Sequence, residues 1–288
     1  MRSRLTLALA AAVSFSGVLW AQVPTVPTDH FGPPTDCVGV HTSAHRRSAS
    51  AAEAEQREGE SQSWLGLTRT LPSHEPVENI AISRMRVADY ADCVGDSGCY
   101  WSELDEQYRR AQDALSVAAK TAHPGEKLAV VMDIDETTLS GYCEIKREDF
   151  GYIGASYEAW IVSPESAVTI PGAKRFFDQA KKLGVAVFFI TGRSGEQEPG
   201  KPSSRENQTA ATIRNLKAAG FGGYTGLALR NGDENGLSTI AYKSRERAKI
   251  AGRGYRIVMS VGDQWSDLLG EPRAETSVKL PNPFYFLP

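Results

Sequence analysis

The stretch Leu128-Ala-Val-Val-Met-Asp-Ile-Asp-Glu-Thr-Thr138 joins a short apolar run to two carboxylates that stand two positions apart. The apolar run, which includes Val130 and Val131, predicts a buried central strand. Asp133 and Asp135 would then lie where this strand leaves the core, and ligands of open parallel α/β sheets bind at that carboxyl end. Because two acids so close repel each other, the pair indicates a cation site. The spacing fits one carboxylate as nucleophile and the other as proton carrier.

The residues after this strand alternate between helical and strand patterns. We expect helices over 171–183, 209–219 and 244–251, and strands over 185–190, 227–229 and 255–261. This order predicts an α/β fold with a Rossmann-like, mostly parallel sheet and helices on both faces. Residues 141–170 interrupt the alternation with several aromatic side chains. Their length predicts a small cap insertion after the first core strand, which acts as a lid or only packs.

The segments before the core strand have three different patterns. Two arginines, an apolar stretch and a small residue at Ala21 are typical of a secretory signal peptide over 1–21, with an uncleaved anchor as the alternative. Residues 22–75 are rich in Pro, Ser, Thr, Ala, Glu and Arg, which predicts a flexible low-complexity segment. Apolar spacing after Pro76 predicts a pair of helices joined by a turn between Cys93 and Cys99. We therefore expect one α/β domain over 76–288.

Composition narrows the classes of partner and compartment. The chain has 288 residues, 41% of them hydrophobic, which is enough for a sizeable core. Its 35 acidic and 32 basic residues give a net charge of -3, and this balance argues against a general nucleic-acid binder. No segment after the first 21 residues is long and apolar enough to form a stable membrane anchor. We expect an exported protein, periplasmic or extracellular, whose oligomeric state the sequence leaves unknown.

The four cysteines can pair in three ways, and the sequence alone does not select one. Export favours disulfides over the alternative of four free, buried thiols. Cys93 and Cys99 flank a turn-like connection, Val-Gly-Asp-Ser-Gly, so we expect a local bridge between them. Cys37 and Cys143 would then tether the N-terminal segment beside the acidic pair.

Three further strand ends add groups that suit a phosphate and a metal. Thr191 and Gly192 follow the strand 185–190 and offer a hydroxyl and backbone N–H groups to phosphate oxygens. Lys243 precedes an expected helix and supplies positive charge. Asp263, with Asp267 four residues on, follows the strand 255–261 and suits Mg²⁺, which prefers oxygen ligands. Each signal alone also fits an ordinary turn or surface residue, but their order, each after an apolar strand, makes the combination specific.

Together these residues match the four motifs of one family. The chain resembles the haloacid dehalogenase (HAD) superfamily of phosphohydrolases in Asp133-Ile-Asp135-Glu-Thr137, Thr191, Lys243 and Gly262-Asp263 with Asp267. The sequences of residues 262–268 and 279–288 resemble those of its secreted acid phosphatase branch. That branch includes class B- and class C-like bacterial acid phosphatases and plant vegetative storage proteins. The resemblance covers 76–288, so this region is expected to be a HAD-like phosphatase domain.

The resemblance implies a mechanism for the acidic pair. Asp133 would attack the phosphorus of a phosphomonoester and form an aspartyl-phosphate. Asp135 would protonate the leaving alcohol and then accept a proton from the hydrolytic water. Mg²⁺ would be held by Asp133, the backbone carbonyl of Asp135, and Asp263.

The remaining motif residues would support this chemistry. Thr191, the Gly192 amide and Lys243 would bind the oxygens of the transferring phosphoryl group. Asp267 would orient Lys243 or a metal-bound water rather than ligate the metal. Thr137 would hold the loop after the strand by a hydrogen bond, or would cap a helix.

These implications lead to three functional expectations. The first is a secreted Mg²⁺-dependent acid phosphatase acting on small phosphomonoesters, including nucleoside monophosphates that stack on the insertion's aromatic side chains. The second is a non-catalytic storage or binding protein on the same scaffold, and the third is a phosphotransferase. The complete set of motif residues favours the enzyme over the storage protein. The loop between Arg193 and Thr209 departs from the family pattern and leaves a substrate role for Arg193 open.

Overall fold

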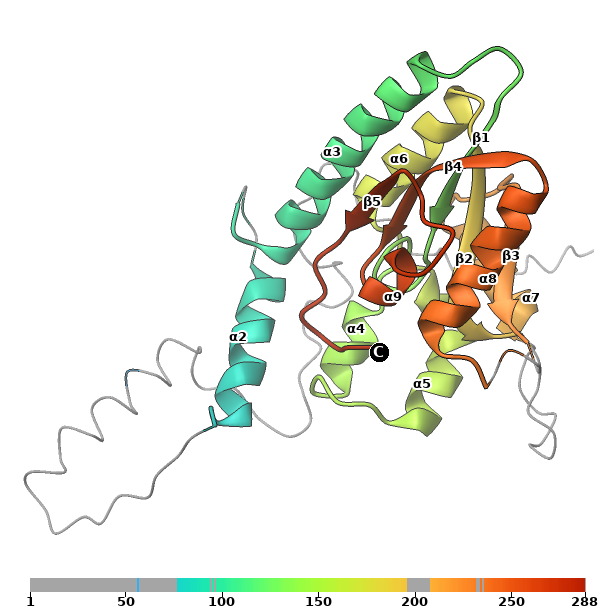
Figure 1. Cartoon of the computed structure of the whole chain (residues 1–288). Helices are drawn as coiled ribbons and strands as arrows, with labels where there is room; N and C mark the ends of the chain where they lie inside the picture. The colour runs from blue at the N-terminus through green and yellow to red at the C-terminus, as the bar shows by residue number, and fades with distance from the viewer. Residues whose placement is uncertain are drawn as a thin grey trace, which may run out of the picture.

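A five-stranded sheet with every neighbouring pair parallel organises the described part of the chain (Figure 1). The structure, a computed structural model, describes residues 77–287 except 94, 96, 196–207, 232–233 and 235, and Gln56 outside that range. The strand order is β3-β2-β1-β4-β5, with the predicted strand at the centre. The strands are β1 (Lys127–Met132), β2 (Ala186–Ser194), β3 (Gly226–Arg230), β4 (Tyr255–Gly262) and β5 (Thr276–Lys279). The predicted α/β fold is confirmed.

Helices cover both faces of this sheet. Successive side chains of β1 point to opposite faces, and because they are apolar, both faces are buried against helices. Val130 and Met132 join an apolar cluster with α3 and α6, while Ala129 and Val131 join a second cluster with α8. This two-sided burial explains the unbroken apolar run in the sequence. The helical elements are α2 (Ile80–Asp92), α3 (Tyr100–Lys120), α4 (Tyr142–Arg147), α5 (Gly154–Ile161), η3 (Pro164–Ala167), α6 (Pro171–Lys182), α7 (Gln208–Ala218), α8 (Thr239–Gly252) and α9 (Trp265–Leu268).

The predicted helical pair before the core strand is α2 and α3. Cys93 and Cys99 form the expected disulfide, with 5.4 Å between their Cα atoms. Cys143 is also disulfide-bonded, but its expected partner Cys37 lies outside the described residues. The expected signal peptide and nearly all of 22–75 lie outside them as well. Within the described ranges, no helix has both the length and the apolar composition needed to cross a membrane.

The residues between β1 and α6 form the small insertion, built from α4, α5 and η3. An antiparallel bridge between Leu139 and Thr169 brings its two ends together. Tyr142 and Trp160 are buried and fix the insertion to the domain. Figure 1 shows α4 and α5 at the end of the molecule to which the strands run, so the insertion lies beside the carboxyl edge of the sheet.

Two details differ from the sequence-based expectation. Lys243 does not precede a helix but lies inside α8, which begins at Thr239 after the capping residue Ser238. The edge strand β5 was not predicted, because of its four residues only Val278 is buried and the apolar signal is correspondingly weak.

Candidate active site

The loop after β1 holds Asp133 by its backbone. The Asp133 amide donates to the Val261 carbonyl of β4 at 3.0 Å. The Thr138 hydroxyl donates to the Asp133 carbonyl at 2.6 Å, and the amides of Thr138 and Leu139 donate to the Ile134 carbonyl. These bonds close a tight turn at the carboxyl end of β1. The carboxylate of Asp133 is thus anchored to the centre of the sheet.

Lys243 connects two of the predicted acids. Its ammonium group donates to Asp133 Oδ1 at 2.7 Å and to Asp267 Oδ1, and all three residues are buried. Burial raises the pKa of Asp133 well above its ordinary value, against the opposing attraction of Lys243. Burial alone would lower the pKa of Lys243, but Asp133 and Asp267 raise it above its ordinary value. The lysine therefore stays charged between the two carboxylates.

Asp263 lies just beyond β4 and is held by three donors. Thr137 Oγ1 donates to its Oδ1 at 2.9 Å, and the side-chain amides of Gln264 and Asn282 each donate to its Oδ2 at 2.7 Å. Thr137 thus ties the loop after β1 to the end of β4, the first of its two predicted roles. Burial and the nearby Asp267 raise the pKa of Asp263 to about 6.

Asp133, Asp263 and Asp267 form a cluster whose chemistry suits a divalent cation. One carboxylate oxygen from each residue can be chosen so that all three lie within 4.8 Å of one another. Among the described residues only Lys243 makes an ion pair with this cluster. When all three carboxylates are ionised, this lysine alone does not neutralise them. Buried excess charge is costly without a counter-ion, and hard cations bind carboxylate oxygens. The donor set therefore fits Mg²⁺.

Asp267 also has partners that restrict its orientation. Besides Lys243, it accepts a hydrogen bond from the Gln264 amide at 2.8 Å. The Arg247 guanidinium, which is fully buried, donates to the Asp267 carbonyl at 2.8 Å. These contacts restrict the orientation of the Asp267 carboxylate beside Lys243.

Asp135 is paired with a residue whose role the sequence left open. Arg193 Nη2 donates to Asp135 Oδ1 at 2.7 Å, and Arg193 Nε donates to Oδ2 at 3.0 Å. The arginine side chain is 1% exposed and also reaches the hydroxyl of Thr212 at 3.2 Å. Its position one residue after the Thr-Gly pair of β2 was the available signal. Asp133 and Asp135 therefore have different cationic partners.

The predicted phosphate-binding residues lie at the same edge of the sheet as the acids. Phe189 of β2 pairs with Met132 of β1, which puts Thr191 close to the level of Asp133. Thr191 and Gly192 lie inside β2, which runs to Ser194, and do not follow it as the sequence predicted. Thr191 is buried, and its hydroxyl accepts from the Arg193 amide at 3.2 Å. Gly192 is exposed, and the space that a Cβ would occupy there is open. An anion could approach this backbone closely.

The insertion brings aromatic side chains to this end of the sheet. The Tyr157 ring of α5 lies 5.6 Å from that of Tyr152 and 5.7 Å from that of Trp160. Burial and the charge of Asp135 raise the pKa of Tyr157 well above its ordinary value, which indicates that α5 lies near the Asp135–Arg193 pair. Of these three rings, that of Tyr157 lies near Asp135.

Glu136 is a buried acid that sequence reasoning did not assign. It takes a left-handed conformation with φ 52° and accepts a hydrogen bond from the Tyr285 hydroxyl at 2.7 Å. Burial and the neighbouring Asp135 raise its pKa to about 8. Tyr285 is far along the chain, so this contact could not be read from local sequence.

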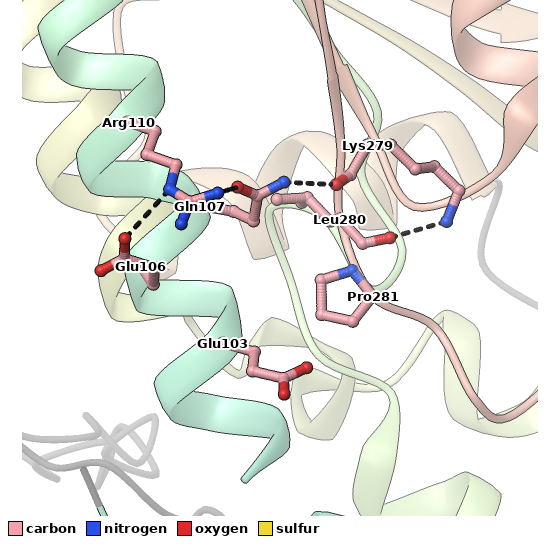
Figure 2. Close-up of a pocket in the computed structure, with 7 residues that line it drawn as sticks. All are labelled: Glu103, Glu106, Gln107, Arg110, Lys279, Leu280 and Pro281. Atoms are coloured by element: carbon pink, nitrogen blue, oxygen red, sulfur yellow. Dashed lines mark hydrogen bonds and ion pairs between the residues drawn. The ribbon is translucent and has the colours of Figure 1, made fainter. Parts of the chain in front are cut away.

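One cavity in the described part of the chain is lined by none of these acids. It has a volume of about 380 Å³ and separates α3 from the stretch after β5. Figure 2 shows Gln107 of α3 pointing toward Lys279, with its side-chain amide donating to the Lys279 carbonyl at 3.0 Å, while Arg110 bonds to Glu106 along the helix. Asp133, Lys243 and Asp267 line a void of only about 10 Å³, so the acids pack closely on their core side.

Known proteins resemble this chain in sequence and in fold. Residues 68–288 match the model of HAD superfamily, subfamily IIIB (acid phosphatase). Acid phosphatase 1 of Solanum lycopersicum is 32% identical over 205 residues, which are 69% of this chain and 74% of that protein. Vegetative storage protein 1 of Arabidopsis thaliana is 30% identical over 162 residues, 55% of each chain.

A solved structure supports the fold independently. The class C acid phosphatase from Bacillus anthracis with tungstate bound superposes with a TM-score of 0.54 at 22% identity, covering 70% of this chain and 85% of that one. The family match spans more than two thirds of the sequence and includes every strand of the sheet. The chain therefore belongs to the HAD superfamily, subfamily IIIB, the acid phosphatase family.

Proposed function

We propose that this acid phosphatase hydrolyses small phosphomonoesters with Mg²⁺ and forms an aspartyl-phosphate at Asp133. The observation that supports this most directly is the position of Asp133. Its Oδ1 is held by Lys243 at 2.7 Å, and it belongs to the acidic cluster with Asp263 and Asp267. In the described part of the chain, hydrogen bonds to this carboxylate reach only Oδ1, which leaves Oδ2 for attack on phosphorus.

The reaction proceeds in two displacements. Asp133 Oδ2 forms a bond to phosphorus while the bond to the leaving oxygen breaks, and Asp135 gives that oxygen a proton. Asp135 then takes a proton from a water that attacks the phosphorus, and the bond to Asp133 breaks. Arg193 holds both oxygens of Asp135 beforehand, so it fixes the direction from which the proton is delivered.

Other residues bind the phosphoryl group and the cation. Thr191, the Gly192 amide and Lys243 provide hydrogen bonds and positive charge for the phosphoryl oxygens. Asp133, the carbonyl of Asp135, and Asp263 would hold Mg²⁺. The bound cation would offset the repulsion between the nucleophile and its anionic substrate.

The substrate class and compartment are part of the same proposal. The row of Tyr152, Tyr157 and Trp160 offers stacking surfaces, which suits nucleoside monophosphates. The Cys93–Cys99 disulfide suits an oxidising compartment, periplasmic or extracellular. A panel of nucleotides and sugar phosphates tests the substrate class. Stacking on these rings should give nucleotides lower KM values than sugar phosphates. Equal KM values for both classes would remove the stacking role.

The central experiment is hydrolysis of p-nitrophenyl phosphate before and after EDTA treatment, with Mg²⁺ then restored. Asp133→Asn should lower kcat by about 10³-fold or more, since nucleophile and base act as a unit. The matched control is Asp113→Asn, an exposed acid on α3, which should behave like the wild type. A rate unchanged by EDTA would remove the metal from the proposal. Full activity of Asp133→Asn would remove the nucleophile.

The likeness to a vegetative storage protein favours a second candidate, a non-hydrolytic storage protein. A folded wild type that shows no hydrolysis with any divalent cation would support it. Phosphotransfer is tested in the same assay by adding an alcohol. More p-nitrophenol than inorganic phosphate would indicate that the alcohol accepts the phosphoryl group.

A further inference from the structure

Residues 280–287, here called the closing segment, run from the edge strand β5 across the carboxyl ends of the central strands. Figure 1 shows this segment passing from β5 toward α4, where the chain ends. The Leu280 amide donates to the Gly262 carbonyl at 2.9 Å, and Gln107 holds the preceding Lys279 carbonyl at the start of the segment (Figure 2). The segment is thus fixed to β4 and to α3 before it reaches the acids.

An aromatic anchor fixes the middle of the closing segment. Phe284 is 8% exposed, and its ring lies 5.0 Å from that of Tyr100, 5.4 Å from that of Tyr142 and 6.3 Å from that of Phe150. These partners come from α3 and from the insertion. The closing segment therefore has a defined position between two parts of the domain.

Asn282 uses this position to reach the acidic cluster. Its Oδ1 accepts from the amides of Phe284 at 2.8 Å and Tyr285 at 3.4 Å, which is the pattern of an Asx turn. Backbone amides can only donate, so they fix Oδ1 toward the turn. They therefore direct Nδ2 toward Asp263, and it donates to Asp263 Oδ2 at 2.7 Å.

The contact completes a set of donors around one carboxylate. Two oxygens of an ionised carboxylate offer about four acceptor positions. Thr137, Gln264 and Asn282 occupy three of those positions on Asp263. Gln264 depends on the closing segment as well, because its Oε1 accepts from the Leu287 amide at 3.1 Å. One acceptor position on Asp263 is left by this count.

We propose that Asn282 is a positioning residue for the cation site. By holding Oδ2, it orients Asp263 so that the remaining acceptor position serves a divalent cation shared with Asp133. Partners that orient a metal ligand typically change metal affinity or activity by about 10- to 100-fold when they are removed. This inference rests on the proposed function only in requiring that a divalent cation binds at the acidic cluster.

Two substitutions separate positioning from mere support of the turn. Asn282→Ser keeps a side-chain oxygen that can accept from the turn amides but removes Nδ2, the atom that donates to Asp263. Asn282→Ala removes both. Gln107→Ala is the matched control, since it deletes an amide that holds the same stretch of chain without touching any acid.

The readout is the binding of Mn²⁺ to the full chain in the absence of substrate. Titration calorimetry or electron paramagnetic resonance measures this binding. We expect the Mn²⁺ dissociation constant to rise about tenfold or more in both Asn282 variants and to stay unchanged in Gln107→Ala. Circular dichroism and thermal melting of the same samples show whether each variant is folded. A folded Asn282→Ser with wild-type affinity would overturn the proposal, whether or not Asn282→Ala is weakened.

The wild-type measurement distinguishes this inference from the proposed function. If the wild type binds no Mn²⁺, the metal-dependent function fails, and the positioning role fails with it. If the wild type binds Mn²⁺ and the Asn282 variants bind it equally well, only the positioning role fails. A loss of binding restricted to the Asn282 variants supports both.

Discussion

Arg193 donates a hydrogen bond to each carboxylate oxygen of Asp135, at 2.7 Å from Nη2 to Oδ1 and 3.0 Å from Nε to Oδ2. Asp133, two residues earlier, is held by Lys243 through one oxygen only. The two acids that are neighbours in sequence thus meet different cations, one planar and bidentate and the other a point charge. The two carboxylates therefore have different electrostatic surroundings.

The first prediction concerns the Arg193 fork. Arg193→Lys keeps a positive charge but cannot donate to both oxygens in one plane, so Asp135 should lose its fixed direction. We expect kcat for p-nitrophenyl phosphate to fall about 10- to 100-fold, in the range of a general acid–base contribution, with a smaller change in KM. Thr212→Val removes only the 3.2 Å contact to Arg193 and should lower kcat less than Arg193→Lys does. Equal kcat for Arg193→Lys and the wild type would exclude the fork from proton delivery.

The second prediction concerns Lys243 as the link between Asp133 and Asp267. Lys243→Met removes the charge and leaves two buried carboxylates facing each other, so the metal-free protein should lose about 3–5 kcal/mol of unfolding free energy at pH 7.5. The loss should be smaller at pH 5, because burial raises the pKa of Asp133 and a protonated Asp133 needs no partner. Urea denaturation in EDTA measures both values. An unchanged urea midpoint at pH 7.5 would contradict the ion pair's role.

The third prediction is a pH dependence set by Glu136. Burial raises its pKa from 4.5 to about 8. A carboxyl with a raised folded-state pKa stabilises the fold most fully below its unfolded pKa, and that contribution is lost as the pH rises toward the folded value. The unfolding free energy of the metal-free protein should therefore fall between about pH 4.5 and pH 8, by up to about 1.4 kcal/mol per pH unit from this group.

Glu136→Gln isolates that contribution, because the amide stays neutral over the whole range. Its stability curve in EDTA should be flatter than that of the wild type, while Glu165→Gln, at an exposed position, should follow the wild type. Some slope should remain, since burial also raises the pKa of Asp263 to about 6. Parallel curves for the wild type and Glu136→Gln would show that Glu136 is not the titrating group.

The fourth prediction concerns the Cys93–Cys99 disulfide. Its two cysteines are separated by 6 positions, and closing so short a loop in the unfolded chain corresponds to about 2 kcal/mol of stabilisation. The double substitution of both cysteines by serine should lower the unfolding free energy by about that amount and leave kcat unchanged, because neither residue contacts the acids. A calorimetric scan with parallel assays tests this. A large loss of kcat in the folded variant would place α2 in the catalytic apparatus.

The central strand and its acids were predictable because their signal is local. β1 is buried on both faces and so reads as a continuous apolar run, and polar residues follow it at once. Asp263 could be found in the same way after β4. The start of α8 was placed too late because Tyr242 is the single buried residue of its first turn. Ser238, whose hydroxyl accepts from the Ala241 amide at 3.2 Å, is nevertheless a standard capping signal.

The partners of these acids could not be predicted from local pattern. Arg193 reaches Asp135 only because β2 lies beside β1 in a particular register. Asn282 lies 19 residues beyond Asp263, in a stretch with no regular periodicity, and its role depends on a turn and an aromatic anchor. Thr137 could likewise hold its loop or cap a helix, and the sequence could not show that its hydroxyl lies 2.9 Å from Asp263 Oδ1.

The parallel sheet has a consequence for how the protein reaches its native state. The contact between Lys243 and Asp133 spans 110 residues, and that between Thr137 and Asp263 spans 126. Contacts so distant in sequence are slow to form because long loops must close first. In a partly folded chain, Asp133 and Asp135 would lack the cationic residues and hydrogen-bond partners that orient them. Recovered phosphatase activity would therefore report completed folding, and a cation that binds only the assembled cluster would favour the native state by mass action.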